Sequence, residues 1–497
     1  MGHPDRPSLR LTALLLSVFP ALATAQEPPA DDGNRLDTVT VSGTRLERDL
    51  ADLPGAATVV DARQTQQGQP GLQLDESLAR VPGLYLQNRY NFAQGLRLSS
   101  RGFGARAPFG VRGLRLNVDG FPETLPDGQS QVDAIDLDAL ESITVLRGPA
   151  SVLYGNASGG VVDMTTRSGA DLVYPQRFSV SGGSDGFRKT NLQLGGADGG
   201  NHHYLSLTGV RYQGQREQSE MEKYLLTSRV GRALSEHRDI EFFFTAMDTP
   251  TAQDPGGLTR AQVEQDRDQA TRFANLLDAG QEVSQQRLGV LYRDRSLGGE
   301  LRARAFVTQR DFTQQLPFPG SSLIDYERLF YGVRLEYVDR VRAFGLAHRF
   351  LVGVDADQQR DDRGRRSVNA DGQVTGLTAD EDQTATAGGV FVQTDTDLSD
   401  TLTLSLGARA DRVRPGIMLY GSSPFPWRAA ADLDLREPRE HGLLFLERRR
   451  LRRPRLRLLQ LLDLAREHVD PRGVRRGAAP RRVGEGEERP PRRFVDD

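Results

Sequence analysis

Apolar and polar residues alternate along the second part of the chain with the period of two that is typical of β-strands. The clearest segments are 301–310, 331–337 and 401–411. Their apolar positions are Leu301, Ala303, Ala305, Val307, Tyr331, Val333, Leu335, Tyr337, Leu402, Leu404, Leu406, Ala408 and Ala410. Segments of about ten residues with one apolar and one polar face are typical of membrane-spanning β-strands. The pattern predicts about eleven such strands between residues 177 and 413.

A water-soluble β-sandwich also alternates, so the connections between strands have to separate the two folds. Short turns are expected at 235–239, 297–299 and 398–400, and long polar connections at 249–282 and 359–384. Membrane barrels have short turns at one end and long loops at the other. The connections therefore favour a barrel with apolar side chains outward and polar side chains inward.

The N-terminus has the three parts of an export signal. Arg6 and Arg10 precede an apolar run over 11–23, and small residues at Ala23 and Ala25 form a cleavage site. We therefore expect a signal peptide over residues 1–25. A membrane anchor is the alternative, but the run is short for a spanning helix.

Residues 26–51 are expected to form a disordered lead that contains one strand-forming segment. Thr38 to Val41 alternates β-branched residues and no partner strand is evident nearby. Such a strand can add to the sheet edge of another protein, or it can be the ordinary first strand of the next domain. The residues alone do not separate these two interpretations.

Short strands, turns and one helix are predicted between residues 58 and 167. Leu74, Leu78 and Val81 share one face of a helix over Asp75 to Val81, and Pro82-Gly83 ends it. The glycine-rich motifs that follow are Arg101-Gly102-Phe103-Gly104, Val118-Asp119-Gly120, the run from Glu141 to Pro149 and the run from Leu153 to Gly160.

In this order the motifs resemble the plug domain of TonB-dependent outer-membrane receptors, and the match is closest to receptors of the ferric-citrate and pyrroloquinoline-quinone type. Tyr90 to Gln94 and Pro126-Asp127-Gly128-Gln129 carry the closer similarity. The resemblance implies a mainly β protein, with an N-terminal α/β plug domain over 52–167 inside a transmembrane antiparallel β-barrel. The family's barrel has about 22 strands, so the partial barrel over 176–413 supplies about half of them. The resemblance also implies that residues 37–41 are the TonB box, made of Asp37, Thr38, Val39, Thr40 and Val41.

Charge is unevenly distributed. Residues 436–497 hold 18 Arg and 11 acidic residues, a net charge of +7, whereas the whole chain carries −3. The preceding part is therefore acidic, which argues against nucleic-acid binding. Alternation also stops after about residue 413. The Arg-rich tail over 414–497 is either a basic amphipathic helix or the product of a frameshift in mid-barrel, and we interpret it as non-native.

No catalytic or metal-binding motif is evident. The chain has no cysteine, which excludes disulfides and thiolate chemistry. His202 and His203 are adjacent and would point to opposite faces of a strand. We therefore expect no enzyme activity, no cofactor and no bound metal.

The resemblance implies a receptor of the bacterial outer membrane that takes up a scarce solute with energy supplied through TonB and its inner-membrane complex. An iron chelate, such as a siderophore or ferric citrate, is the expected ligand. The alternatives are a pyrroloquinoline-quinone receptor, a non-functional receptor fragment and a secreted β-rich binding protein. The expected partners are TonB, outer-membrane lipid and an anionic small molecule, and the protein is expected to be a monomer.

Candidate ligand-binding residues lie at the plug apex. They are Arg89, Tyr90, Asn91, Phe92, Arg97, Arg101, Arg106 and Arg112. Arginine suits an anionic ligand because its planar fork binds carboxylates in pairs of hydrogen bonds. Ion pairing between plug and barrel is an equally good interpretation of each of these arginines.

Overall fold

The computed structural model describes most of the chain up to residue 448. The described residues are 40–41, 48–49, 56–87, 90–107, 110–148, 154–155, 157–172, 174–399, 402–420, 428–432 and 440–448. They belong to one compact unit, Met1–Arg449. The predicted signal peptide and most of the predicted tail lie outside the described residues. Within those residues, no helix has the length and apolar character needed to cross a membrane.

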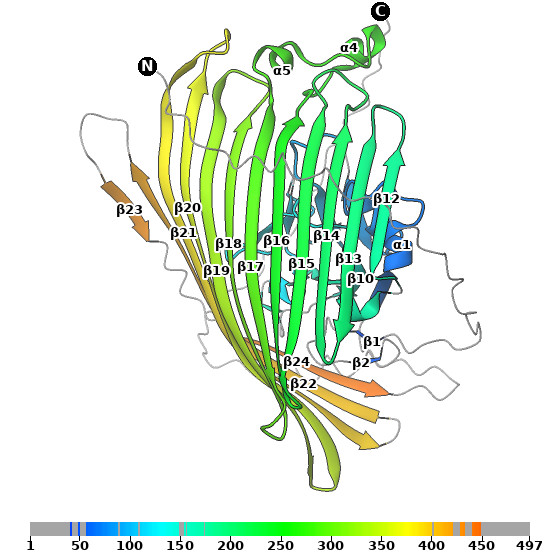
Figure 1. Cartoon of the computed structure of the whole chain (residues 1–497). Coiled ribbons are helices and arrows are strands. Elements are labelled where there is room, and N and C mark those ends of the chain that lie inside the picture. Colours follow the sequence, from blue (N-terminus) through cyan, green and yellow to red (C-terminus); the bar gives the residue numbers. More distant parts are fainter. Residues whose placement is uncertain are drawn as a thin grey trace, which may run out of the picture. The chain divides into compact units, whose positions relative to one another are not determined.

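The first domain contains two small sheets and short helices (Figure 1). A five-stranded sheet has the order β3-β10-β11-β7-β8, and a four-stranded sheet has the order β4-β5-β6-β9. Their strands are β3 (Ala56–Asp61), β4 (Leu84–Gln87), β5 (Arg97–Ser100), β6 (Val111–Arg112), β7 (Arg115–Val118), β8 (Phe121–Pro122), β9 (Gln129–Ser130), β10 (Leu140–Arg147) and β11 (Gly160–Thr166). The helices are α1 (Ala62–Gln66), α2 (Asp75–Leu78) and the 3-10 turn η2 (Gly169–Asp171).

Helix α2 forms where the sequence predicts it and is shorter than expected. Its backbone is helical over Asp75–Leu78, with Ala79 as the capping residue. Leu74, Leu78 and Val81 are almost fully buried and belong to the main core of this domain. The helix therefore stabilises the domain by placing one apolar face against the two sheets.

The second domain is a large antiparallel sheet of long strands (Figure 1). Strands β12 to β22 pair in sequence order, which confirms the eleven predicted strands. They are β12 (Gln176–Gly182), β13 (Arg188–Asp198), β14 (Asn201–Tyr212), β15 (Met221–Ser235), β16 (Arg238–Gln253), β17 (Gly280–Asp294), β18 (Glu300–Gln315), β19 (Gly320–Ala343), β20 (Leu346–Val368), β21 (Val374–Ser399) and β22 (Leu402–Tyr420). Two further strands, β23 (Arg428–Asp432) and β24 (Glu440–Arg448), pair with different stretches of β22.

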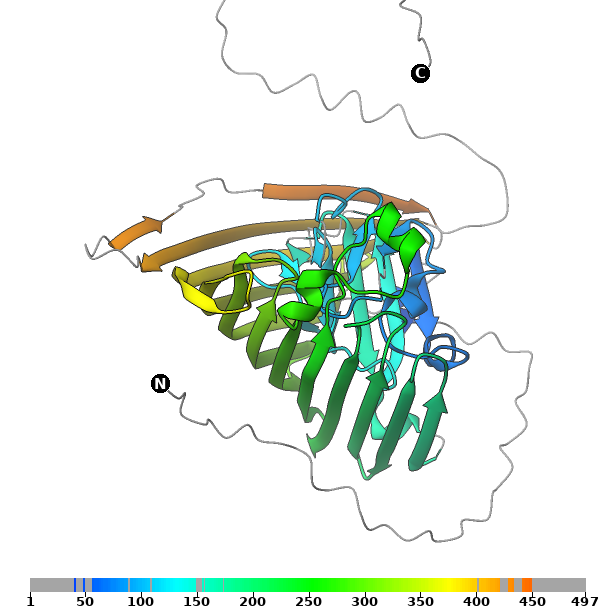
Figure 2. The same ribbon diagram turned by 90° about the horizontal axis from the view of Figure 1, so that it is seen from above.

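Seen from above, the large sheet curves around the first domain (Figure 2). Its concave face is polar and buried, with residues such as Arg287, Glu336 and Gln359 pointing inward. Its convex face exposes apolar side chains such as Val333, Val354 and Val390. A water-soluble sandwich has the opposite arrangement, with its apolar face inward. The structure therefore confirms the predicted orientation of the alternating faces.

The connections agree with the sequence at one end of the sheet and differ at the other. The predicted short turns lie between β15 and β16, β17 and β18, and β21 and β22. At the opposite end, the connection predicted over 249–282 is shorter than expected, because β16 and β17 extend into it. It covers residues 254–279 and includes α4 (Arg260–Gln265) and α5 (Arg272–Leu276).

The expectation of a long loop at 359–384 is wrong. Residues up to Val368 continue β20, residues from Val374 belong to β21, and only 369–373 lie between the two strands. The charged side chains that suggested a loop are distributed over the two faces of the ladder, as at Asp361 and Asp362.

Two further differences concern the ends of the strand-forming regions. Strand β22 continues to Tyr420, beyond the expected end of alternation at 413, because its backbone stays in register with β21. At the other end, β1 (Thr40–Val41) pairs with β2 (Arg48–Asp49) in an antiparallel bridge, so this segment has a local partner that the sequence did not predict. The domain boundaries themselves stay predictions.

Candidate functional site

A cavity of about 1010 Å³ lies between the first domain and the inner face of the sheet. Its lining includes residues 254–257, the start of the connection between β16 and β17. Seven cationic and four acidic side chains line it. They are Arg112, Arg216, Lys223, Arg310, Arg328, Arg363 and Arg365, with Asp127, Asp133, Asp254 and Asp361. The lining therefore carries a surplus of positive charge.

The floor of the cavity includes residues 90–95, which we call the plug apex. Two inward-facing glutamines hold its backbone: Gln281 Nε2 donates to Phe92 O at 3.0 Å and Gln314 Nε2 donates to Ala93 O at 2.9 Å. Phe92 packs edge-on against Tyr212 of β14. Tyr90 is 60% exposed and has a positive φ of 50°, a conformation that costs energy for a residue with a side chain. Strained exposed residues of this kind cluster at binding sites.

Two of the lining arginines are already neutralised. Arg310 of β18 makes a two-pronged contact with the plug's Asp133, at 2.6 and 3.1 Å. Arg328 of β19 does the same with Asp361 of β20, at 2.6 and 2.8 Å, and lies over the Tyr326 ring. These pairs shape the wall, and their charges are not available to a ligand.

Of the other four lining arginines, Arg216 donates to backbone carbonyls, and three make no contact of either kind within the described part of the chain. Among the described residues, no hydrogen bond or ion pair involves the guanidinium groups of Arg112, Arg363 and Arg365. Arg112 lies on β6 of the first domain, whereas Arg363 and Arg365 lie on the inward face of β20. The cavity therefore offers positive charge from both domains to an anion placed between them.

The structure brings together half of the candidate residues predicted from the sequence. Tyr90, Asn91, Phe92 and Arg112 line the cavity. Of the other four, the three that the structure describes do not line it. Arg97 donates hydrogen bonds to Gln87 and to Ala105 O, and Arg101 lies beside Gly83. Arg106 is exposed away from the cavity, and Arg89 lies outside the described residues. Their contact with a ligand stays a prediction.

Sequence reasoning missed the arginines that the sheet contributes. Arg363 and Arg365 fall in the segment that was expected to be a loop. Reading the period of two through Gln359 and Asp361 would have placed both arginines on the polar, inward face.

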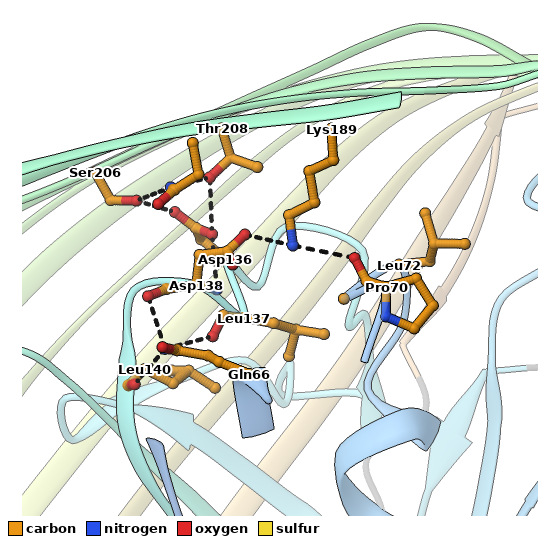
Figure 3. Close-up of polar contacts among 12 residues, drawn as sticks. Gln66, Pro70, Leu72, Asp136, Leu137, Asp138, Leu140, Lys189, Ser206 and Thr208 are labelled. Carbon is orange, nitrogen blue, oxygen red and sulfur yellow. Dashed lines mark hydrogen bonds and ion pairs between the residues drawn. The ribbon is translucent and has the colours of Figure 1, made fainter. Parts of the chain in front are cut away.

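The first domain is joined to β13 and β14 by a buried polar network (Figure 3). Asp136 accepts hydrogen bonds from Ser206 Oγ at 2.8 Å and Thr208 Oγ1 at 3.2 Å. Lys189 Nζ lies 2.6 Å from Asp138 Oδ2 and donates to Pro70 O at 3.2 Å. Burial, together with the neighbouring carboxylate of Asp138, raises the pKa of Asp136 to about 6.

A second contact between the domains is the turn that joins β7 and β8. Phe121 packs edge-on against Phe243 and Phe306 of the sheet, with ring centroids 5.2 and 6.2 Å away. Next to it, Glu123 forms a two-pronged ion pair with Arg287 of β17, and both side chains are buried. Gly289 of β17 leaves the space that the Phe121 ring occupies.

Two models of one family match the chain. The TonB-dependent receptor plug domain matches residues 49–161, and the TonB-dependent receptor-like beta-barrel matches residues 224–417. Together they cover more than half of the chain.

Individual relatives are more distant. The rhizobactin receptor of Rhizobium meliloti (strain 1021) is 25% identical over 465 residues, covering 82% of this chain and 60% of its own. The ferric aerobactin receptor of Klebsiella pneumoniae is 27% identical over 203 residues, covering 40% of this chain and 26% of its own. The chain thus spans less than two thirds of the length of these relatives.

Solved structures share the fold. The unliganded ferric citrate transporter FecA superposes with a TM-score of 0.67 at 20% identity, covering 83% of this chain and 62% of its own. The siderophore receptor PiuA from Acinetobacter baumannii gives a TM-score of 0.62 at 16% identity, covering 83% of this chain and 64% of its own. A plug beside a curved antiparallel sheet, matched by both family models, shows that the chain belongs to the TonB-dependent receptor family.

Proposed function

We propose that this protein acts in the bacterial outer membrane as a TonB-dependent receptor that takes up an anionic iron chelate. Relatives named as rhizobactin, ferric aerobactin and ferric citrate receptors or transporters support an iron chelate as the ligand. The observation that carries the anionic class is the set of three unpaired arginines around the cavity, Arg112, Arg363 and Arg365. No covalent chemistry is needed for such a function.

These three arginines favour an anionic ligand because of their charge and geometry. Arg363 and Arg365 are partly buried without a partner, which costs free energy that a bound anion would offset, whereas Arg112 is exposed and adds charge. Carboxylates and hydroxamates also match the guanidinium fork in geometry. Because Arg112 comes from the plug and the other two come from β20, a bound anion would bridge the domain that moves during uptake and the wall that stays.

Binding of ferric citrate, used as the probe, tests this proposal. Replacing Arg363 or Arg365 by Gln should weaken binding by a factor of about 10 to 150 each, since a hydrogen bond to a charged group contributes about 1.5–3 kcal/mol. Arg342→Gln is the matched control because Arg342 is exposed at the opposite end of β19 and does not line the cavity. Unchanged affinity in both cavity variants would contradict the assignment.

Pyrroloquinoline quinone is the second candidate ligand, and the aromatic lining favours it. Phe312 and Tyr326 line the cavity as a stacked pair, with ring centroids 4.7 Å apart and planes inclined by 16°. A planar tricarboxylate could extend such a stack while its carboxylates reach the arginines. Competition between pyrroloquinoline quinone and ferric citrate for the purified protein decides the order of preference.

Energy coupling is proposed to begin at the TonB box, Asp37–Val41. Residues 37–39 lie outside the described residues, and the backbone bridge of Thr40–Val41 with Arg48–Asp49 is short enough to be exchanged for a strand of TonB. Val39→Pro removes a ladder donor and should abolish uptake while leaving ligand binding intact, whereas Val39→Ala should retain uptake. Equal uptake by the proline and alanine variants would contradict the assignment of these residues as the TonB box.

Location is tested by fractionation. An outer-membrane receptor should sediment with outer membranes and require detergent for extraction. Recovery in the soluble periplasmic fraction would instead support the secreted β-rich binding protein or the inactive fragment.

A further inference from the structure

A buried carboxylate joins the plug apex to the longest connection of the sheet, residues 254–279. Asp254 directly follows β16 and is 3% exposed. Its Oδ1 accepts hydrogen bonds from Asn91 Nδ2 at 2.7 Å and from Gly256 N at 2.9 Å. Its Oδ2 accepts a third from Gln94 Nε2 at 2.9 Å. Two of these donors belong to the plug and one to the loop.

Hydrogen bonds connect the two ends of the loop to each other and to the neighbouring connection. Asp254 N donates to Ala279 O at 2.8 Å, which closes the two ends of the loop on each other. Arg216, from the neighbouring connection, donates to Gly256 O at 2.8 Å and to Gln269 O at 2.8 Å. A change in the position of Asp254 should therefore alter the conformation of the whole loop base.

We propose that Asp254 is a positioning residue that couples the plug apex to loop 254–279. When the apex withdraws, the carboxylate loses the donors Asn91 and Gln94 and keeps only Gly256 N of the loop. A carboxylate that is 3% exposed and has lost two of its three donors is unfavourable, and loosening of the loop base lets water replace them. The coupling is reciprocal, so an ordered loop also holds Asn91 and Gln94 in place at the cavity floor. This inference concerns conformational coupling and stands independently of which ligand binds.

Hydrogen exchange of the full chain in detergent micelles tests the coupling without a ligand. Replacing both Asn91 and Gln94 by Ala should speed amide exchange in residues 254–279 at least tenfold. Gln314→Ala is the matched control because it removes the bond to Ala93 O and leaves Asp254 untouched. Exchange in the β17–β18 ladder reports whether the sheet still folds. Equal exchange of the loop in the double variant and the wild type, with an intact ladder, overturns the proposal.

Two further variants make the test specific. Exchanging the partners, with Asn91→Asp and Asp254→Asn combined, restores an amide–carboxylate hydrogen bond in the opposite sense. Loop exchange in this swapped variant should return to within about threefold of wild type, whereas Asp254→Asn alone should stay fast. In the reverse direction, Arg216→Ala should loosen the loop base and speed exchange at residues 91–95. A swap that does not rescue, or an apex that is insensitive to Arg216, counts against coupling through Asp254.

Discussion

Two aspartates of the plug, Asp133 and Asp136, face the sheet, and only Asp133 is paired with a cation. Burial raises the pKa of Asp133, but Arg310 and Lys223 outweigh it and hold that pKa below its ordinary value. Asp136 has hydroxyl donors and no directly paired cation, and burial with the nearby Asp138 raises its pKa to about 6. Charge on Asp136 is therefore unfavourable in the folded protein, whereas charge on Asp133 is favourable.

Asp136 gives the plug a pH dependence whose sign follows from this shift. Because the folded protein binds this proton more tightly than the unfolded chain does, stability should fall as pH rises through 4 to 6. The difference amounts to roughly 3 kcal/mol if one pKa unit is about 1.4 kcal/mol. Asp136→Asn should remove most of this slope and should be more stable than wild type at pH 7. Denaturant unfolding at pH 4.5 and 7.5 measures this change in the free energy of unfolding. The same pH dependence in Asp136→Asn and wild type would contradict its assignment to Asp136.

Among the elements of the plug, the turn between β7 and β8 packs closely against the sheet. Its Phe121 ring fills the space over Gly289, where a Cβ would lie 2.7 Å from the ring. Gly289→Ala should therefore cost about 1–3 kcal/mol of stability, because the aromatic cluster around the ring leaves little room to move. Combining it with Phe121→Leu should recover part of that loss. Additive effects in this double-mutant cycle would mean that the two residues do not share the space.

The ion pair beside this turn allows a second test of the same element. Arg287 and Glu123 are both buried, so removing one partner leaves a charge without compensation. Glu123→Gln alone should destabilise the protein by about 3–5 kcal/mol, whereas Glu123→Leu with Arg287→Met should cost much less. Thermal unfolding in detergent compares the variants. A double variant as unstable as the single one would show that the pair's hydrogen bonds, such as Arg287 Nε to Thr308 Oγ1, carry the stability instead.

Local pattern predicted most of the elements, and it did not predict how they meet. The period of two located the strands, and the face shared by Leu74, Leu78 and Val81 located helix α2. The pairing of Asp254 with Asn91 joins residues 163 positions apart, and no spacing in the sequence encodes such a contact. Charged residues in β20 were taken for a loop because a strand facing a polar lumen has no apolar inner face to mark it.

At the scale of the whole molecule, the large sheet is inverted relative to a soluble protein. Charged pairs such as Arg304 with Glu336 lie on the buried inner face, and the outer face carries valine and leucine. The plug covers only the inner face, so the apolar outer face has no cover among the described residues. The ion pairs that reach the plug, such as Arg310 with Asp133, hold the two domains together through polar contacts on this inner face.

A substitution at Val333 tests whether the apolar outer face contacts lipid. Val333 lies near the middle of β19, points outward and is 58% exposed. In a soluble protein an exposed Val→Arg substitution would change stability little. In a lipid bilayer an outward arginine near the midplane costs about 2–4 kcal/mol. We therefore expect Val333→Arg to lower the yield of folding into phospholipid vesicles sharply, while Glu264→Arg in the surface loop leaves it unchanged. Equal yields for the two variants would mean that this face of the sheet does not contact lipid.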